Sequence, residues 1–568
     1  ALGVWKELVG SSPFSMRFFA ALAGVLSIAL SWALGSWLGG RRVALLGALF
    51  VTLAPMQVHY GREAKGYTFA TALALLSTYA WGCRLGYVDA KTKPVRNSKR
   101  WWVVYVLSTA SALATHYCLA PLVLWQGLWT VVSPGIAITR ARSNRSRNLA
   151  QLSRRLLAAG GILSLLLPWA VPLFGSTVRG AEGVSNASPL SLPIYLGKVG
   201  QAIGAGLAQA GLHASLVSFG LLILASAGLL ALNRGLFWAT SLAVPLVGAY
   251  LIQSAFSFFF PRFLLYLGPI CYLIAAHGMV TVTRSFPSIT LLVLTVVVIG
   301  LWMPGLWHVY ARPTDQAENP RPVVARLRAV SRLDDALVYV YIWQVGYVLG
   351  HYPQNELSFY RAYWPPQTVG EELTSILDSH PRLWRMSYDV EARDPHNLPN
   401  AWLEDNAYRV ESTWYGRHNL ALYVAPDFRT PGAGPVTKTA SFDGKIELSY
   451  PQVDAKLRPG DVLALPLRWR ALAEPGADCV VFVHVGLPDT PPLAQDDEQP
   501  HNGLELTGTW NVGQAVLARH ALLLPQDMAS GRYLVQVGLY RASDGIRLPP
   551  NGANWADALT LGYMEVGR

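Results

Sequence analysis

The sequence predicts a polytopic α-helical membrane protein, followed by a small α/β domain and a C-terminal antiparallel β-sandwich. Hydrophobic residues make up 52% of the 568 residues and charged residues only 14%, whereas soluble domains carry about 25% charged residues. Long apolar runs fill residues 14–308, and the remainder has the composition of soluble protein. We therefore expect three parts: a helical part at 1–308, an α/β domain at 309–428 and a β-sandwich at 429–568.

Apolar runs of membrane-spanning length dominate the first part, because a helix needs about 20 apolar residues to cross the bilayer core. Residues 101–133 would form a helix of about 50 Å if they were continuous. The basic stretches before and after them, KTKPVRNSKR and TRARSNRSRNLAQLSRR, both favour the cytoplasm, so the chain must turn near His116. We predict ten spans, near 16–38, 43–59, 67–88, 101–115, 117–133, 156–175, 212–232, 235–255, 262–283 and 287–308.

The distribution of Lys and Arg predicts the orientation, since short cytoplasmic loops are enriched in both. It also accounts for the net charge of +12 without nucleic-acid binding. The loops expected in the cytoplasm are Arg41-Arg42, the two basic stretches, Arg234 and Arg284. The loops expected outside are HYGREAKGY (59–67), the His116 turn, 176–211 and QSAFSFFFPRF. Ten crossings then place residues 309–568 outside as well.

The start of the chain is also expected outside, although no signal peptide precedes the first apolar run. We therefore expect at least one further helix upstream of Ala1. A natural protein with an outer N-terminus is the alternative.

The stretch HYGREAKGY concentrates ionisable groups between two apolar runs. Tyr, Arg and Lys at such a boundary can simply anchor helices. Ionisable groups at membrane depth also indicate functional sites, and the other outer turns supply compatible side chains. Cations gathered on one face suit a phosphate on a lipid. The candidate phosphate-binding residues are Arg62, Lys65 and Arg262, with Glu63, Tyr67, His116 and Tyr117 in support.

Several short motifs in order resemble one family. They are Phe14-Ser15-Met16-Arg17 after Trp5 and Gly10, Pro55, HYGREAKGY, the THY turn at 115–117, and Pro261-Arg262-Phe263 with Pro269. Together they resemble the GT-C superfamily of membrane glycosyltransferases. The likeness is to bacterial glycosyltransferase family 39, relatives of protein O-mannosyltransferases and of the lipid A aminoarabinose transferase. The resemblance covers roughly residues 1–425.

The resemblance implies an enzyme of the bacterial inner membrane that transfers a sugar from a polyprenyl-phosphate donor to a lipid, glycan or protein acceptor on the exoplasmic face. The family's catalytic acid, usually Asp, lies in the first outer loop, which we expect upstream of Ala1. Glu7 is too close to the next helix to replace it. The family usually has Arg where this chain has Lys65, so the charge is kept but the planar fork is lost.

No cofactor and no metal is expected. Cys83, Cys118, Cys271 and Cys479 show no spacing typical of a metal site or a disulfide framework.

The second half reads as two domains. In the α/β domain we predict strands at DDALVYVYI, PRLWRMSYDV and NLALYVA, and a helix at EELTSILDSH. In the β-sandwich we predict strands at KIELSY, VLALPLRWR, CVVFVHVGL, QAVLARHALLL and RYLVQVGLY. Several side chains have two interpretations, as core or as ligand contacts. The aromatic residues that could contact a sugar are Trp343, Tyr360, Tyr363, Trp364, Trp469 and Trp510. The acidic residues that could hold calcium are Asp496 and Asp497.

Two other functions compete with the transferase. A transporter or flippase for a lipid-linked glycan should carry polar groups at mid-bilayer, whereas here the ionisable groups gather at the ends of the runs. A non-catalytic glycan-binding membrane anchor is the third reading.

The orientation can be tested by reporter fusions. We expect fusions within 91–100 and within 140–155 to report the cytoplasm, because both stretches are strongly basic. A reporter active outside at either position would overturn the orientation and the outer placement of HYGREAKGY.

Overall fold

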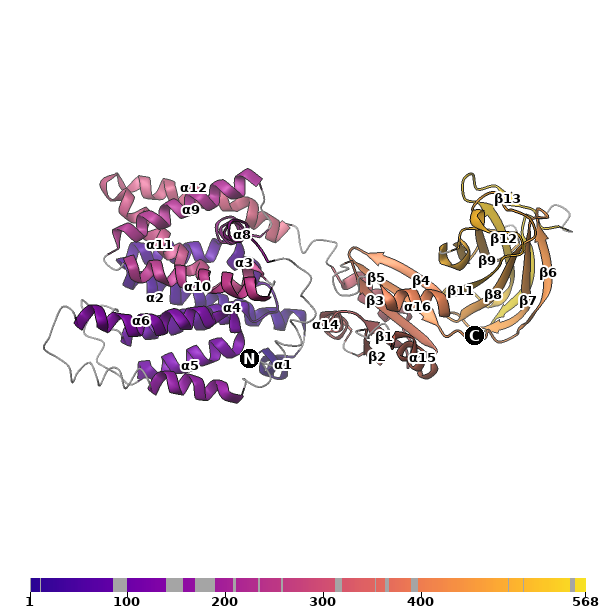
Figure 1. The fold of residues 1–568 in the computed structure, drawn as a ribbon, viewed down its shortest axis with the longest axis horizontal. Coiled ribbons are helices and arrows are strands. Elements are labelled where there is room, and N and C mark those ends of the chain that lie inside the picture. The colour runs from indigo at the N-terminus through magenta and orange to yellow at the C-terminus, as the bar shows by residue number, and fades with distance from the viewer. Residues whose placement is uncertain are drawn as a thin grey trace. The chain divides into compact units, whose positions relative to one another are not determined.

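The computed structural model describes residues 2–10, 12–84, 100–138, 157–168, 189–207, 211–232, 235–256, 259–311, 319–352, 354–362, 367–389, 397–488, 490–503, 505–551 and 557–567. The chain divides into two compact units, Ala1–Thr314 and Asp315–Arg568, and each is described by itself. The described elements of the first unit are helices, and all described strands belong to the second (Figure 1).

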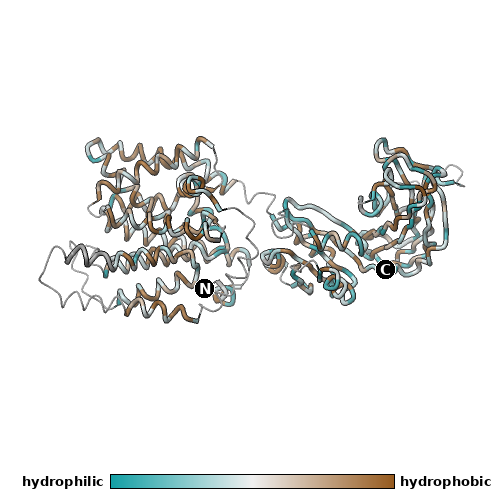
Figure 2. Tube along the Cα trace, in the orientation of Figure 1, coloured by the Kyte–Doolittle hydropathy of each residue, from teal (hydrophilic) through white to brown (hydrophobic). Residues whose placement is uncertain are grey.

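The described elements of the first unit are helices, and hydrophobic residues run along most of them (Figure 2). The described helices are α1 (Leu2–Val9), α2 (Pro13–Leu53), α3 (Pro55–Gly61), α4 (Tyr67–Arg84), α5 (Arg100–Thr115), α6 (Ala120–Ile138), Leu157–Pro168, α8 (Leu192–Gly204), α9 (Gly211–Ala231), α10 (Gly235–Phe256), α11 (Leu267–Val282) and α12 (Ser288–Ala311). Three short 3₁₀ turns join some of them: η1 (Tyr117–Leu119), η2 (Pro261–Leu264) and η3 (Thr283–Ser285).

Helix α2 reverses direction within its 41 residues. Gly39 and Gly40 leave the helical conformation, and Gly40 has a φ of 78°, which glycine adopts without strain. A Cβ on Gly35 would lie 2.8 Å from the Cα of Ala44, although nine residues of straight helix would separate these positions by about 13 Å. The two arms are therefore antiparallel, as expected for separate spans at 16–38 and 43–59.

Four of the described helices are long and apolar enough to cross a membrane: α2, α9, α10 and α12. The turn predicted near His116 is confirmed, because α5 ends at Thr115 and η1 begins at Tyr117. Of the predicted span at 156–175, residues 157–168 are described and form a helix. The total of ten spans stays a prediction.

Glycines allow the backbones of α9 and α11 to touch at two positions. A Cβ on Gly228 would lie 2.1 Å from the Ile274 carbonyl oxygen, and one on Gly278 would lie 2.0 Å from the Leu224 carbonyl oxygen. The two backbones are therefore in direct contact, and no side chain fits between them at either position.

The second unit begins with a five-stranded sheet in the order β2-β1-β3-β5-β4. Strand β1 pairs in parallel with β2 and β3, whereas β5 pairs antiparallel with β3 and β4. The strands are β1 (Ala336–Tyr339), β2 (Ser358–Arg361), β3 (Arg382–Tyr388), β4 (Tyr408–Tyr415) and β5 (His418–Val424). The α/β fold of this segment agrees with the sequence prediction.

Helices pack on both faces of this sheet. One hydrophobic cluster joins Leu383 to Leu373 of α15 (Val369–Ser379) and to Leu403 of α16 (Leu398–Asn406). A second cluster joins Trp384 to α13 (Arg321–Val330) and α14 (Ile342–His351). Because neighbouring residues of a strand point to opposite faces, the adjacent Leu383 and Trp384 reach different helix pairs.

The C-terminal part is β-rich, as predicted, but its nine strands form one continuous hydrogen-bonded sheet. The strands are β6 (Ala433–Phe442), β7 (Ile446–Leu457), β8 (Val462–Ala471), β9 (Cys479–Gly486), β10 (Ala494–Glu498), β11 (Ala515–Leu523), β12 (Gly531–Arg541), β13 (Arg547–Leu548) and β14 (Leu559–Val566). The expectation of purely antiparallel pairing is wrong at one place, because the second half of β7 pairs in parallel with β14. The first half of β7 pairs with β8, so this strand links the two halves of the sheet.

The two sandwich tryptophans belong to the core. Trp469 and Trp510 are 0% and 3% exposed, so neither presents a stacking surface for a sugar. Tyr363 and Trp364 lie outside the described residues, whereas Trp343 is 36% exposed at the start of α14.

The glycine contact between α9 and α11 makes a testable prediction. We expect Gly228→Ala to lower the unfolding temperature in detergent, since overpacking costs about 1–3 kcal/mol. Gly220→Ala on the same helix is the matched control, because no atom lies within 4 Å of a Cβ built there. Equal melting temperatures for the two variants would contradict the packing described.

Candidate functional site

The stretch HYGREAKGY forms a tight turn between two helices. Helix α3 ends at Gly61 and α4 begins at Tyr67, so residues 62–66 make the connection. The Thr68 hydroxyl donates to the Tyr60 carbonyl at 2.9 Å, which ties the start of α4 back to the end of α3. The turn therefore holds its charged side chains close to both helix ends.

Glu63 is the centre of the charges in this turn. Its Oε1 lies 3.3 Å from Nε2 of His59, and its Oε2 lies 3.2 Å from Nζ of Lys65. Burial raises the pKa of Glu63, but the hydrogen bond from His59 and the charge of Lys65 outweigh it, so the pKa of Glu63 lies below its ordinary value. Glu63 is thus an ionised carboxylate that orients two basic side chains.

Arg262 lies among aromatic rings instead of carboxylates. Its guanidinium carbon is 3.9 Å from the ring centroid of Phe260 and 5.6 Å from that of Tyr67. The same guanidinium interacts with the phenol groups of Tyr60 and Tyr67. Among the described residues, no acidic group forms an ion pair with Arg262, and its Nε has no hydrogen-bond partner. Its positive charge is therefore not neutralised by a side chain that the structure describes.

His116 lies beside Arg262 at the junction of α5 and η1. Its Nδ1 accepts a hydrogen bond from the Cys118 backbone N–H at 3.3 Å, and its ring lies 5.1 Å from that of Tyr67 and 5.3 Å from that of Phe263. Burial, reinforced by the charge of Arg262, lowers the pKa of His116 to about 4. The imidazole is therefore neutral at pH 7 and can donate or accept a hydrogen bond, but adds no charge.

The structure brings together three of the predicted residues, Tyr67, His116 and Arg262. They line one narrow pocket whose volume is about 10 Å³, roughly the space of a single water molecule. Tyr117 stands at its edge, with its ring 5.1 Å from that of His116 and 43% of its surface exposed. The side chains therefore pack against one another and enclose no open site.

Arg62 is placed elsewhere. It donates a hydrogen bond to the Val309 carbonyl oxygen, and its guanidinium carbon lies 5.0 Å from the ring centroid of Tyr310. Arg62 thus contacts the last turn of α12, and no hydrogen bond or shared ring joins it to Arg262. The structure thus places Arg62 apart from Arg262, and the convergence of all three cations on one group stays a prediction.

A larger cavity adjoins the same turn. Its volume is about 150 Å³, and it is lined by Pro55, His59, Gly206, Leu207, Gly305, His308 and Val309. His59 therefore faces both this cavity and Glu63. Sequence reasoning missed His308, because a single histidine at the end of an apolar run carries no signal of its own. Its position becomes informative only when α12 is seen to end beside α3.

The proposed calcium ligands are used in other contacts. Asp496 lies 2.8 Å from Nδ1 of His520, and Asp497 lies 2.9 Å from Nε2 of His484. Among the described residues, no group of three or more His, Cys, Asp or Glu side chains is arranged to hold a metal ion.

The low pKa of His116 predicts a pH dependence of stability. The folded protein favours the neutral ring, so the unfolded chain binds this proton more readily and stability is lost as the pH falls from about 6.5 towards 4. We expect His116→Gln to show a smaller decrease in unfolding temperature over this interval than the unmodified chain. Parallel curves for the two proteins would show that His116 is not the titrating group.

Part of the chain matches the model of a known protein family. Residues 2–143 match the family model described as dolichyl-phosphate-mannose-protein mannosyltransferase. This segment contains HYGREAKGY, His116 and Tyr117, and it ends before Arg262. No curated protein matches the chain.

Solved structures of low identity resemble the chain. One is ArnT from Cupriavidus metallidurans bound to undecaprenyl phosphate, at 13% identity and a TM-score of 0.48, covering 74% of this chain and 86% of that one. Another is the arabinofuranosyltransferase AftD from Mycobacteria, at 12% identity and a TM-score of 0.41, covering 97% and 53%. A third is the oligosaccharyltransferase AglB from Archaeoglobus fulgidus with an inhibitory peptide and a dolichol-phosphate, at 10% identity and a TM-score of 0.38, covering 97% and 87%. The family match over residues 2–143 confirms the predicted resemblance to the GT-C superfamily of membrane glycosyltransferases.

Proposed function

We propose that this protein transfers a sugar from a polyprenyl-phosphate donor to an acceptor on the exoplasmic face of a bacterial membrane. The observation that carries the proposal is the Arg262 guanidinium beside Tyr67 and His116, with no acidic partner among the described residues. An uncompensated cation at this position attracts an anion. The matching family model, whose description names a lipid-phosphate sugar, covers the turn that Arg262 faces.

The chemistry of such a transfer accounts for the cations. When the sugar leaves its carrier, negative charge accumulates on the phosphate, and fixed positive groups lower the energy of that transition state. Arg262 would supply a planar fork for two phosphate oxygens, and Lys65 would supply a point charge. Lys65 is held by Glu63 at 3.2 Å, so its ammonium group is already oriented before the donor binds.

Glu63 and His116 have supporting roles in this proposal. Glu63 is not assigned as the base for the acceptor hydroxyl, because His59 and Lys65 occupy both of its oxygens and keep its pKa low. A neutral His116 would hydrogen-bond a phosphate or sugar oxygen without adding charge. Tyr67 and Tyr117 would contribute their phenol groups in the same way.

Donor binding requires the narrow pocket to open. The space among Tyr67, His116 and Arg262 accommodates one water, which is far less than a phosphate with its sugar. Since Arg262 is held by aromatic contacts and no carboxylate among the described residues, an incoming phosphate can draw the guanidinium out without breaking an ion pair. Arg62 would reach the phosphate only after leaving the Val309 carbonyl.

The proposal is tested by transfer assays with a polyprenyl-phosphate sugar in detergent or nanodiscs. We expect Arg262→Ala to reduce turnover on the order of 100-fold, as for loss of one transition-state donor. Arg62→Ala should also reduce turnover sharply, while both variants stay inserted and folded. Arg284→Ala is the matched control, because this exposed arginine lies in η3 at the opposite end of α11. Near-normal turnover in both Arg62→Ala and Arg262→Ala would refute the phosphate site.

A further inference from the structure

Arg385, in the middle of β3, is a buried cation that forms no ion pair with any acidic side chain the structure describes. Only 6% of its surface is exposed, and no carboxylate among the described residues forms an ion pair with it. Arg382, three residues earlier and 5% exposed, shows the usual arrangement, with its Nε 3.2 Å from Asp335. Burying a charge without a counter-charge is strongly unfavourable, so Arg385 needs an explanation.

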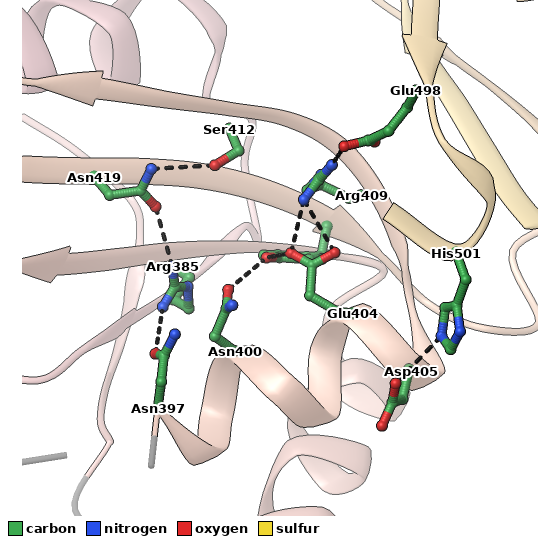
Figure 3. A network of polar contacts seen from close by, with 11 residues as sticks. Arg385, Asn397, Asn400, Glu404, Asp405, Arg409, Ser412, Asn419, Glu498 and His501 are labelled. Atoms are coloured by element: carbon green, nitrogen blue, oxygen red, sulfur yellow. Dashed lines mark hydrogen bonds and ion pairs between the residues drawn. The ribbon is translucent and has the colours of Figure 1, made fainter. Parts of the chain in front are cut away.

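The guanidinium of Arg385 donates hydrogen bonds to the neutral amide oxygens of two asparagine side chains (Figure 3). Its NH1 donates to Oδ1 of Asn397 at 3.3 Å, and its NH2 donates to Oδ1 of Asn419 at 3.1 Å. Asn419 is held in turn by the hydroxyl of Ser412 at 3.1 Å. The Nε of Arg385 has no hydrogen-bond partner in the structure. These contacts orient the guanidinium, but none of them brings a negative charge from the described part of the chain.

The nearby acids are already paired with other groups. Glu404 lies 3.1 Å from NH1 of Arg409 and accepts a hydrogen bond from Tyr423 at 2.8 Å. Glu498 pairs with the same arginine, and Asp405 lies 3.2 Å from Nε2 of His501. Figure 3 shows Glu404 and Glu498 contacting Arg409, and Asp405 contacting His501 as a separate pair. Glu404, Glu498 and Asp405 therefore form their ion pairs with residues other than Arg385.

The N-terminus of α16 meets Arg385 at Asn397. This residue is the N-cap of the nine-residue helix and has a φ of 47°. Its side chain makes no capping hydrogen bond, because its oxygen accepts from Arg385 instead. A helix N-terminus carries partial positive charge and favours anions. Asn397 is exposed, so this positively charged position is open to solvent.

We propose that Arg385, Asn397 and the N-terminus of α16 form a binding site for an oxyanion, a carboxylate or a phosphate group. The guanidinium is suited to both, since its N–H groups match the spacing of two oxygens. A bound oxyanion would supply a counter-charge that the described side chains do not provide. The group could belong to an acidic sugar or to free phosphate. This site belongs to the second unit, not to the one that contains HYGREAKGY. It does not depend on the proposed transferase activity.

Hydrogen–deuterium exchange on the full-length protein in detergent tests the site. The probes are sodium phosphate and sodium glucuronate, each compared with sodium chloride at equal ionic strength. We expect slower exchange in peptides spanning 397–412 with at least one of the two probes. A response to phosphate alone or to glucuronate alone would assign the source of the oxyanion. No slowing with either probe would overturn the proposal.

Two substitutions and a control show whether Arg385 is responsible. Asn397→Asp places a carboxylate within hydrogen-bonding distance of the guanidinium. This carboxylate should take the place of the oxyanion, so the probes should no longer slow the exchange while the protein stays folded. Arg385→Gln should weaken the apparent affinity tenfold or more, as roughly expected for losing a charged hydrogen bond. Arg328→Gln, at an exposed position on α13, should respond like the unmodified chain. If Asn397→Asp kept a normal response, the anion would be bound elsewhere, even if Arg385→Gln failed to fold.

Discussion

The reversal of α2 is the constraint on which the candidate site depends. Gly35 and Gly47 leave a notch between the two arms, and Leu273 of α11 fills it, since a Cβ on Gly47 would lie 2.3 Å from Cδ2 of Leu273. The arms therefore set the position of α11, and η2 immediately precedes that helix. Gly24 of the first arm packs near Thr68, since a Cβ on Gly24 would lie 3.7 Å from Cγ2 of Thr68. Through these contacts, Arg262 and the turn at 62–66 come to the same end of the helices.

Three charged side chains, Glu63, Arg262 and Arg385, have three different environments. Glu63 forms an ion pair with Lys65 and lies 3.3 Å from Nε2 of His59, so it needs no ligand to balance its charge. Arg262 is surrounded by aromatic rings, which attract a cation only weakly compared with a carboxylate. Arg385 is held by amide oxygens. Because the last two cations lack an acidic partner among the described residues, each is suited to bind an anion that is not part of the chain.

Several features of the fold follow from local sequence patterns. The reversal at Gly39–Gly40 and the turn at His116 are where interruptions of the apolar runs place them. The strands at 336–339, 382–388 and 418–424 also follow their apolar runs. These features depend on neighbours along the chain, for which hydrophobicity and glycine content are direct indicators. Tyr67, His116 and Arg262 lie in three turns that the distribution of Lys and Arg predicts on one side of the membrane. Their meeting in one pocket depends on contacts between helices remote in sequence.

The sequence by itself determined the helical first half, the α/β and β-rich second half, and the turns that carry the candidate residues. Tertiary structure alone decided which side chains meet. Arg62 reaches Val309, 247 residues away, and so is separated from Arg262. Trp469 and Trp510 are core residues, and Arg385 is buried beside the start of α16. These outcomes depend on contacts between residues remote in sequence, and periodicity cannot reveal them because it reports only which face of its own element a residue occupies.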